Sequence, residues 1–310
     1  MLASINYDRA MRTTALLLLS LSAACSPRAT PLDAGIDAGA EVVTIAAAGD
    51  ISPNALADQQ KTSDLVVDAG YDAVLVLGDN QYPSGEIAEY RKYFHPTWGR
   101  VKDKIFPVPG NHEYLLGSTA PGYFSYFGAR AGDPAKGYYS FDLGQWHIIA
   151  LNSNDGRCLA VPCGPASEQL TWLKDDLAAN KKKCTLAFWH HPRFNSGSRH
   201  GNNAEVSAFW DALYAADADV VLNGHEHVYE RFDPQTPDAG ADAARGIREF
   251  LVGTGGVGFY DFALPQPNSA LREAATFGVL KLTLKPDSYD WEFVAVQPST
   301  FTDKGSANCH

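Results

Sequence analysis

Side chains that can bind metal ions recur in this sequence directly after short runs of apolar residues. Two of these places carry Gly-Asp, a third carries Gly-Asn-His-Glu, a fourth His-His-Pro and a fifth Gly-His-Glu-His. Carboxylate, phenol, amide and imidazole groups of this kind bind first-row metal ions in proteins. The candidate ligands that these places supply are Asp50, Asp79, Tyr82, Asn111, His190, His225 and His227.

Seven ligands are too many for one metal ion and suit two ions, provided that one carboxylate bridges them. Two ions roughly 3.5–4 Å apart can clamp an in-line displacement and lower the pKa of a bound water to about 7. His225 and His227 are two residues apart, so in an extended segment both side chains point to one face and can reach such a pair. The pattern therefore predicts metal-dependent hydrolysis.

Each candidate ligand also has a structural interpretation. Asp50 and Asp79 could cap turns or helices, as aspartate after glycine often does, and Tyr82 could pack within its Tyr-Pro-Ser-Gly turn. Of the neighbours His190 and His191 one must be structural, and we take His190 as the ligand. The agreement of five motifs favours the metal interpretation over these separate alternatives.

The elements that position these residues are short apolar runs of the kind that forms buried strands. Each run ends directly before one of the five motifs, and the runs span 42–48, 73–77, 105–108, 184–189 and 219–222. In an open α/β sheet the carboxyl ends of the strands form the ligand crevice. The five motifs are therefore expected to converge at one place.

Helical patterns separate these strands, and more strands follow toward the C-terminus. We expect a hairpin formed by 138–141 and 145–151. We also expect helices over 54–69, 86–94, 166–180 and 203–215, and strands over 247–252, 278–284 and 288–296. Alternating strands and helices indicate an α/β fold, which the antiparallel strands of the C-terminal part join.

The order of the motifs resembles that of the calcineurin-like metallophosphoesterases: Gly-Asp, Gly-Asp-x-x-Tyr, Gly-Asn-His-Glu, His-x-Pro and Gly-His-x-His. The tyrosine of the second motif and the ending Gly-His-Glu-His-Val-Tyr-Glu-Arg look specifically like purple acid phosphatases, in an exported bacterial form. The resemblance covers about residues 44–300. It implies an α/β fold with a four-layer β-sandwich flanked by helices, and a phosphomonoesterase that uses a metal-bound hydroxide.

The resemblance also implies which ion each ligand holds. The first ion, Fe(III) in purple acid phosphatases, would be held by Asp50, Asp79, Tyr82 and His227. The second ion, which is Zn, Mn or Fe(II) in the family, would be held by Asp79 as the bridge together with Asn111, His190 and His225.

Two further histidines would act on the substrate in such an enzyme. His112 would hydrogen-bond the substrate phosphate, and His200 would help to protonate the leaving alkoxide. Two positions depart from related enzymes. Ser52 stands where most metallophosphoesterases carry the histidine of Asp-x-His, and Ser84 stands where plant enzymes carry an acidic residue.

Two other functions stay open. The same site would serve a phosphodiesterase or nucleotide hydrolase, and a non-catalytic surface lipoprotein could keep the fold to bind phosphate or metal, although the complete ligand set disfavours it. The segment from Gly253 to Gly258 matches a dinucleotide-binding pattern. No helix start follows it, so we interpret it as a tight turn near the rim of the site.

The N-terminal residues are typical of an export signal. Residues 1–24 combine arginines with an apolar run, as signal peptides do. Leu-Ser-Ala-Ala-Cys resembles a bacterial lipobox and predicts membrane attachment through lipidated Cys25, with a simple cleaved signal as the alternative. Residues 25–41 predict a flexible tether before a catalytic domain over 42–310. The extra N-terminal β domain that the family often carries is expected to be absent.

Composition limits the compartment and the partners. The formal net charge is −11 over 310 residues, and an acidic chain without basic runs is a poor nucleic-acid binder. The resemblance implies small phosphoesters as partners, and the export signal predicts the periplasm or the outer membrane or cell surface as the location. Four cysteines follow Cys25, and export favours disulfides. Cys158 with Cys163 and Cys184 with Cys309 is one of the three pairings that four cysteines allow.

Overall fold

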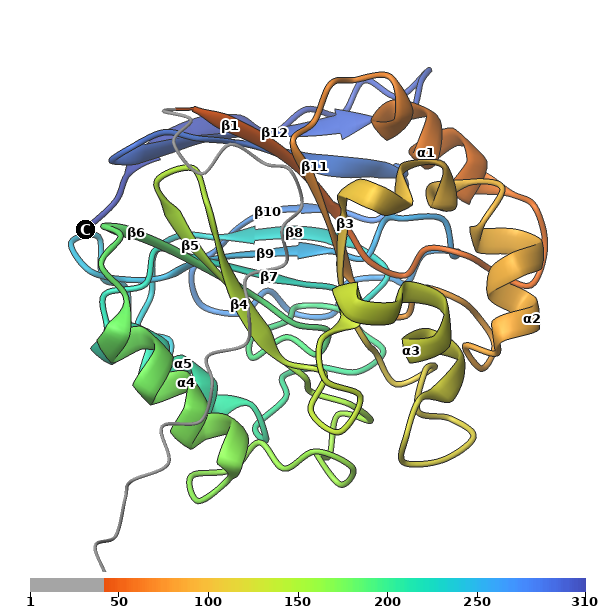
Figure 1. The fold of residues 1–310 in the computed structure, drawn as a ribbon. Helices are drawn as coiled ribbons and strands as arrows, with labels where there is room; N and C mark the ends of the chain where they lie inside the picture. The colour runs from red at the N-terminus through yellow and green to blue at the C-terminus, as the bar shows by residue number, and fades with distance from the viewer. Residues whose placement is uncertain (1–41) are drawn as a thin grey trace, which may run out of the picture. The chain divides into compact units, whose positions relative to one another are not determined.

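The computed structural model describes residues 42–310. They form two β-sheets that share one hydrophobic core and have helices around them (Figure 1). The expected signal peptide, the tether and Cys25 lie outside the described residues. Within residues 42–310, no helix has the length and apolar character needed to cross a bilayer.

The first sheet has six strands in the order β13-β12-β11-β1-β2-β3. β1, β2 and β3 run parallel, whereas β11 pairs antiparallel with β1 and continues into an antiparallel meander. The strands are β1 (Val43–Ala48), β2 (Ala73–Leu77), β3 (Ile105–Val108), β11 (Gly278–Leu284), β12 (Ser288–Ala295) and β13 (Lys304–Asn308).

The second sheet has seven strands in the order β10-β8-β9-β7-β6-β5-β4. Its centre, β5 to β7 with β9, is parallel, and antiparallel strands stand at both edges. The strands are β4 (Tyr139–Leu143), β5 (Trp146–Ala150), β6 (Cys184–Phe188), β7 (Val220–Asn223), β8 (Tyr229–Phe232), β9 (Arg248–Val252) and β10 (Ser269–Glu273).

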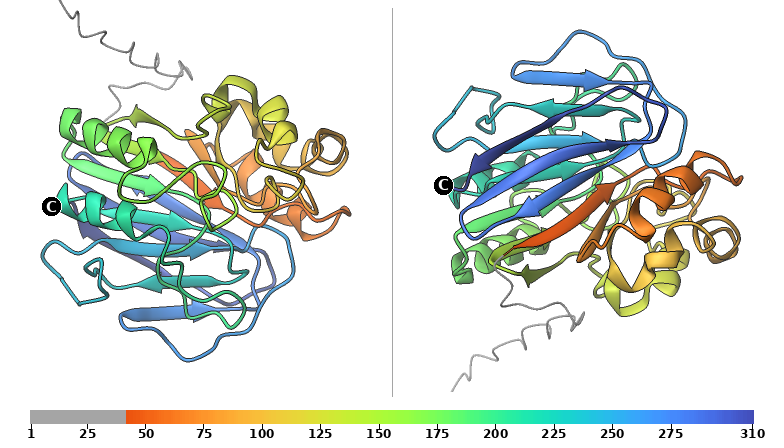
Figure 2. Two further views of the ribbon diagram at one scale, coloured as in Figure 1. Left: turned by 90° about the horizontal axis from the view of Figure 1, so that it is seen from below. Right: turned by 90° about the horizontal axis from the view of Figure 1, so that it is seen from above.

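The helices lie on two sides of this sandwich. Figure 2 shows α4 and α5 together against the second sheet, apart from the orange and yellow helical segments that follow β1, β2 and β3. The Ser167 hydroxyl accepts from Leu170 N at 3.1 Å and caps α4. The helices are α1 (Asp58–Val67), α2 (Ile87–Glu89), α3 (Pro121–Phe127), α4 (Glu168–Ala179) and α5 (Ser207–Ala215), with a π-helix (Tyr90–Phe94) and two 3₁₀ helices (Trp98–Lys104 and Gly128–Ala131).

The fold confirms the predicted class, an α/β sandwich flanked by helices. The five strands expected before the motifs are all present, and their ends shift by at most one residue. β2 and β6 are buried along their whole length. Central parallel strands are covered on both faces, which is why β2 and β6 appear in the sequence as largely apolar runs.

The helix expected over 86–94 is present, and most of it is π-helical. A short α-helical turn leads into the π-helix, in which His95 N donates to Tyr90 O at 2.8 Å. Tyr90 and Phe94 are both buried, with their rings 5.6 Å apart, and the Tyr90 hydroxyl donates to Glu113.

Two disulfides join the four cysteines, Cys158 with Cys163 and Cys184 with Cys309. The first closes a loop after β5. The second joins the start of β6 in the second sheet to the residue after β13 in the first sheet. It therefore links the two layers of the sandwich covalently.

One buried histidine lies far along β5 from the candidate ligands. His147 Nδ1 is 3.0 Å from Asp142 Oδ1, and its Nε2 is 2.8 Å from Asp176 Oδ2. Burial disfavours the imidazolium, but the hydrogen bonds to these two carboxylates outweigh it and raise the pKa of His147 above its ordinary value. The imidazole thus connects the β4–β5 hairpin to α4.

We expect His147→Gln to lower the free energy of unfolding by about 2 kcal/mol at about pH 5.5, because hydrogen bonds to charged groups contribute roughly 1.5–3 kcal/mol. A raised folded pKa gives a contribution that is complete below the unfolded pKa and is lost as pH rises through the folded pKa. Urea unfolding at about pH 9 should therefore show a smaller difference between variant and wild type. Equal losses at both pH values would contradict this account.

Candidate metal centre

The loops that carry the five motifs meet where the carboxyl ends of β1, β2, β3, β6 and β7 come together. Backbone hydrogen bonds tie the loops to one another: Asp50 N donates to Gly78 O at 3.1 Å, and Gly224 N donates to His190 O at 3.0 Å. Both sheets contribute ligand candidates, the first through β1, β2 and β3 and the second through β6 and β7. The predicted convergence is therefore what the fold produces.

Four of the candidate ligands surround one point. The Tyr82 hydroxyl lies 2.9 Å from Asp50 Oδ1, 3.0 Å from Asp79 Oδ2 and 3.1 Å from His227 Nε2. His227 Nε2 is 3.4 Å from Asp50 Oδ1. These are the four residues expected to hold the first ion, and each directs an oxygen or a nitrogen toward the others.

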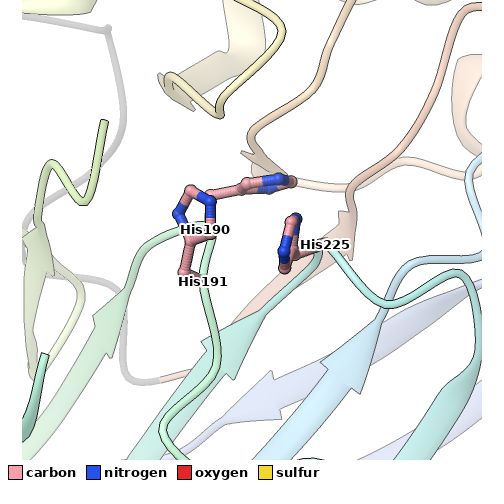
Figure 3. Close-up of side chains that lie close together, drawn as sticks. All are labelled: His190, His191 and His225. Carbon is pink, nitrogen blue, oxygen red and sulfur yellow. The ribbon is translucent and has the colours of Figure 1, made fainter. Parts of the chain in front are cut away.

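The remaining three candidates gather beside this group. His190 Nε2 lies 3.3 Å from Asp79 Oδ2 and 3.2 Å from Asn111 Oδ1. The rings of His190 and His225 are 5.0 Å apart and face the same space, as Figure 3 shows together with His191. Asp79 Oδ2 therefore lies between the two groups.

The backbone holds the two aspartates in an uncommon conformation. Asp50 and Asp79 have φ of 57° and 47°, and His225 has φ of 71°, all in the left-handed region that non-glycine residues rarely adopt. His225 N donates to Asp50 Oδ2 and His112 N donates to Asp79 Oδ1, both at 2.8 Å. One oxygen of each carboxylate is thus held by the backbone, and the other faces the candidate ligands.

Glu113 fixes the loops that carry Asp79 and Asn111. Its buried carboxylate accepts from Gly110 N at 2.7 Å, Asn80 N at 2.9 Å and the Tyr90 hydroxyl at 2.9 Å. Burial and the nearby Asp79 raise the pKa of Glu113 to about 8. Gly110 is required here, because a Cβ would overlap Asp79 Oδ1.

The electrostatics of the site favour cations. Burial opposes ionisation of Asp79, but His190 and His112 hold its pKa below the ordinary value, and Asp79 in turn raises the pKa of His190 to about 9. Burial and the carboxylates of Asp50 and Asp79 raise the pKa of Tyr82 well above its ordinary value. Positive charge at this point would stabilise both carboxylates and the phenolate.

The two histidines expected to act on substrate lie beside the ligand groups and are part-exposed. His112 Nε2 is 3.8 Å from Asp79 Oδ2, and its Nδ1 hydrogen-bonds the Pro83 carbonyl. The His200 ring stacks on His225 at 3.9 Å. Both side chains, 28% and 30% exposed, can therefore meet a ligand from solvent.

Three further residues that were not predicted as ligands or catalytic groups lie at the site. The His191 ring is 4.3 Å from that of His225, and its Nδ1 is 2.8 Å from Ser153 Oγ. The Tyr260 ring stacks on His227 at 4.1 Å. Glu226 hydrogen-bonds His200 Nδ1. Two of the three had a visible signal in the sequence: His191 stands beside His190, and Glu226 stands between two candidate ligands.

The glycine-rich segment forms the turn that we expected at the rim. Gly255 N donates to Gly49 O at 3.0 Å, and Val257 N donates to Asp50 O at 3.1 Å. His227 Nδ1 hydrogen-bonds the Gly258 carbonyl at 2.8 Å, which leaves Nε2 to face the Tyr82 group. The segment that matches the dinucleotide-binding pattern in sequence thus orients the candidate ligand His227.

A sequence model described as calcineurin-like phosphoesterase matches residues 43–229, which contain every candidate ligand. The chain belongs to the calcineurin-like phosphoesterase family. Among named relatives, purple acid phosphatase 15 of Arabidopsis thaliana is 32% identical over 48% of this chain and 30% of its own length. Acid phosphatase type 7 of Homo sapiens is 28% identical over 53% of this chain and 41% of its own length.

Solved structures of low sequence identity share the fold. A purple acid phosphatase, PPD1, from yellow lupin seeds superposes with a TM-score of 0.71 at 17% identity, over 87% of this chain and 54% of that one. GAP50 of Plasmodium gives a TM-score of 0.68 at 13% identity, over 87% and 90%. The family member described here spans less than half the length of the named plant and human relatives.

Proposed function

We propose that the protein is a binuclear-metal phosphohydrolase that acts on small phosphomonoesters. The observation that carries the proposal is the place of Asp79 Oδ2, 3.0 Å from the Tyr82 hydroxyl and 3.3 Å from His190 Nε2, between two sets of ligand atoms. Relatives named as purple acid phosphatases support a metal-dependent phosphoric ester hydrolase.

The two ligand groups suit different ions. The group of Asp50, Asp79, Tyr82 and His227 contains a phenol, and a trivalent ion would stabilise its phenolate against two neighbouring carboxylates. We assign iron to this group. The second group offers two imidazoles, an amide and the shared carboxylate, which suits zinc, manganese or ferrous iron.

Bound there, two cations would neutralise the phosphoryl oxygens and lower the pKa of a bound water to about 7. The chain supplies the rest. In this proposal His112 donates a hydrogen bond to a phosphoryl oxygen and His200 Nε2 gives a proton to the leaving oxygen, which their part-exposed positions beside the ligand groups support. No serine or cysteine nucleophile is needed, because water makes the attack.

Tyr82 gives the assignment of iron a spectroscopic test. The iron-loaded protein is expected to absorb visible light through phenolate-to-Fe(III) charge transfer, and Tyr82→Phe is expected to lose that band. Tyr114→Phe is the matched control, since the Tyr114 hydroxyl hydrogen-bonds Asn152 outside the ligand groups. A colourless wild type that holds two iron ions would show that Tyr82 does not bind ferric iron.

The function itself is tested by comparing hydrolysis of p-nitrophenyl phosphate and bis(p-nitrophenyl) phosphate in the presence of Fe with Zn or Mn. Faster monoester turnover that is abolished in His190→Ala supports the proposal. The control is His95→Ala, which should keep full activity. His95 is exposed and forms a hydrogen bond with the Tyr126 hydroxyl. Preference for the diester would move the function to a phosphodiesterase with the same site.

A non-catalytic binding protein is the contrasting outcome. The fold alone does not decide against it, because GAP50 is described as the anchor in the inner membrane complex of Plasmodium. Turnover of neither ester by protein that holds two metal ions would favour this class.

We propose that the protein acts outside the cytoplasm. Its two disulfides are typical of oxidising compartments, and residues 1–24 predict an export signal. Attachment through lipidated Cys25 stays a prediction from the sequence. Mass spectrometry of the N-terminal peptide from the membrane fraction would detect the lipid, and a free N-terminus on secreted protein would contradict it.

A further inference from the structure

Glu226 lies between the candidate ligands His225 and His227 in the sequence, but its side chain contacts the segment 195–200. The residue is fully buried. Its carboxylate is 2.9 Å from His200 Nδ1, and it accepts a hydrogen bond from His200 N at 3.1 Å. It also accepts from Arg199 N at 2.9 Å and from Asn195 Nδ2 at 3.0 Å. One carboxylate therefore satisfies four donors of the segment 195–200.

This segment fits Glu226 closely. A Cβ on Gly197 would overlap Cγ, Cδ and Oε1 of Glu226, so only glycine leaves room for the side chain. Further hydrogen bonds hold the middle of the segment: Ser196 N donates to Glu230 Oε2 at 2.9 Å, and Ser198 N donates to Asp261 O at 2.8 Å. His200 is therefore held through both its backbone and its ring.

We infer that Glu226 is the positioning residue for His200: its carboxylate orients the His200 ring over the metal centre. The inference rests on the proposed function, in which His200 protonates the leaving oxygen. With Nδ1–H donated to Glu226, Nε2 is the nitrogen left to face the substrate. The proton moves from Nε2 to the leaving oxygen as the bond to phosphorus breaks, and Nδ1 keeps its own proton.

The position of a proton donor can be tested by varying the leaving group. We expect Glu226→Gln to lower kcat for phenyl phosphate by on the order of 10²-fold, the lower end of what general acid catalysis contributes. For 2,4-dinitrophenyl phosphate, whose leaving group departs without a proton, kcat should change little, and KM should change little for both esters. Glu205→Gln, an exposed glutamate of the neighbouring segment, is the matched control.

A second measurement does not depend on activity. Loss of the carboxylate should free the segment around Arg199, so that trypsin cleaves after Arg199 faster in Glu226→Ala than in the wild type. Metal analysis should still find two ions in each variant. If the wild type proves inactive, faster cleavage of Glu226→Ala than of the wild type would show that the positioning role holds although the proposed function fails.

A double substitution tests the fit with Gly197. Gly197→Ala alone should lower the melting temperature and reproduce the leaving-group dependence of Glu226→Gln, because its Cβ displaces the carboxylate. In the Glu226→Ala background the same change should cost little. Equal losses of kcat for both esters, unchanged cleavage after Arg199, or loss of metal in Glu226→Gln would each overturn the inference.

Discussion

Asp79→Asn is expected to lower turnover of p-nitrophenyl phosphate by about 10³-fold or more, because each tenfold corresponds to about 1.4 kcal/mol and two cations supply several kcal/mol. Asparagine keeps the size of the side chain and can still accept from His112 N, which holds Asp79 Oδ1 at 2.8 Å. The substitution removes the charge of Oδ2, the atom that faces both ligand groups.

The measurement pairs kinetics with metal analysis. The metal content should fall from two ions in the wild type to one ion or none in Asp79→Asn. The rise in melting temperature on metal addition should become smaller in the variant as well. Asp211→Asn, an exposed aspartate of α5, should change neither quantity. A variant that keeps two ions and full turnover would exclude Asp79 as the bridging ligand.

Removal of the disulfide between Cys184 and Cys309 is expected to lower the free energy of unfolding more than removal of the disulfide between Cys158 and Cys163. Cys184 and Cys309 are 125 residues apart, and loop closure over that length is worth about 5 kcal/mol in the chain-entropy account. Cys158 and Cys163 are only five residues apart, for which the same account gives about 2 kcal/mol. The long-range bond also connects the two sheets, so its loss affects both layers.

The two double Cys→Ala variants are therefore each other's controls. Guanidinium unfolding of each, with wild type alongside, should give a larger loss for the 184/309 pair. A larger loss for the 158/163 pair would show that local order near the site, rather than loop entropy, sets the contribution of these bonds.

Much of the fold could be predicted because its central strands are buried on both faces. β2 is a continuous apolar run and β6 is interrupted only by Thr185, and Asp79 and His190 follow within two residues of their ends. The change from apolar to polar marks the end of the strand and the start of the site at once. That coincidence made the five motifs and their convergence visible without the structure.

The strands that were missed lack this contrast. β13 has the sequence Lys-Gly-Ser-Ala-Asn, with no large apolar residue, and forms through pairing with β12 at the edge of the sheet. β8 contains the buried Glu230, which hydrogen-bonds Ser196 N from another part of the chain. β10 is a half-exposed edge strand. Tertiary contacts, rather than the local pattern, make these segments extended.

The site shows the same division. The candidate ligands were found because each follows a strand end, whereas Tyr260 reaches His227 from a loop 33 residues away in the sequence. Nothing local distinguishes that tyrosine from one that packs in the core. The role of Glu226 likewise depends on contacts with the segment 195–200, which only the folded chain brings near it.

β6 is attached to the first sheet at both of its ends, in a different way at each. It begins at Cys184, which is bonded to Cys309 of the first sheet, and it leads into His190, which lies beside Asp79 and Asn111 of the first sheet. With the metal ions that we propose, the two layers would be fastened covalently at one edge and by coordination at the other. The centre would form only when the two sheets pack together. Metal uptake would therefore report when the two sheets dock during maturation.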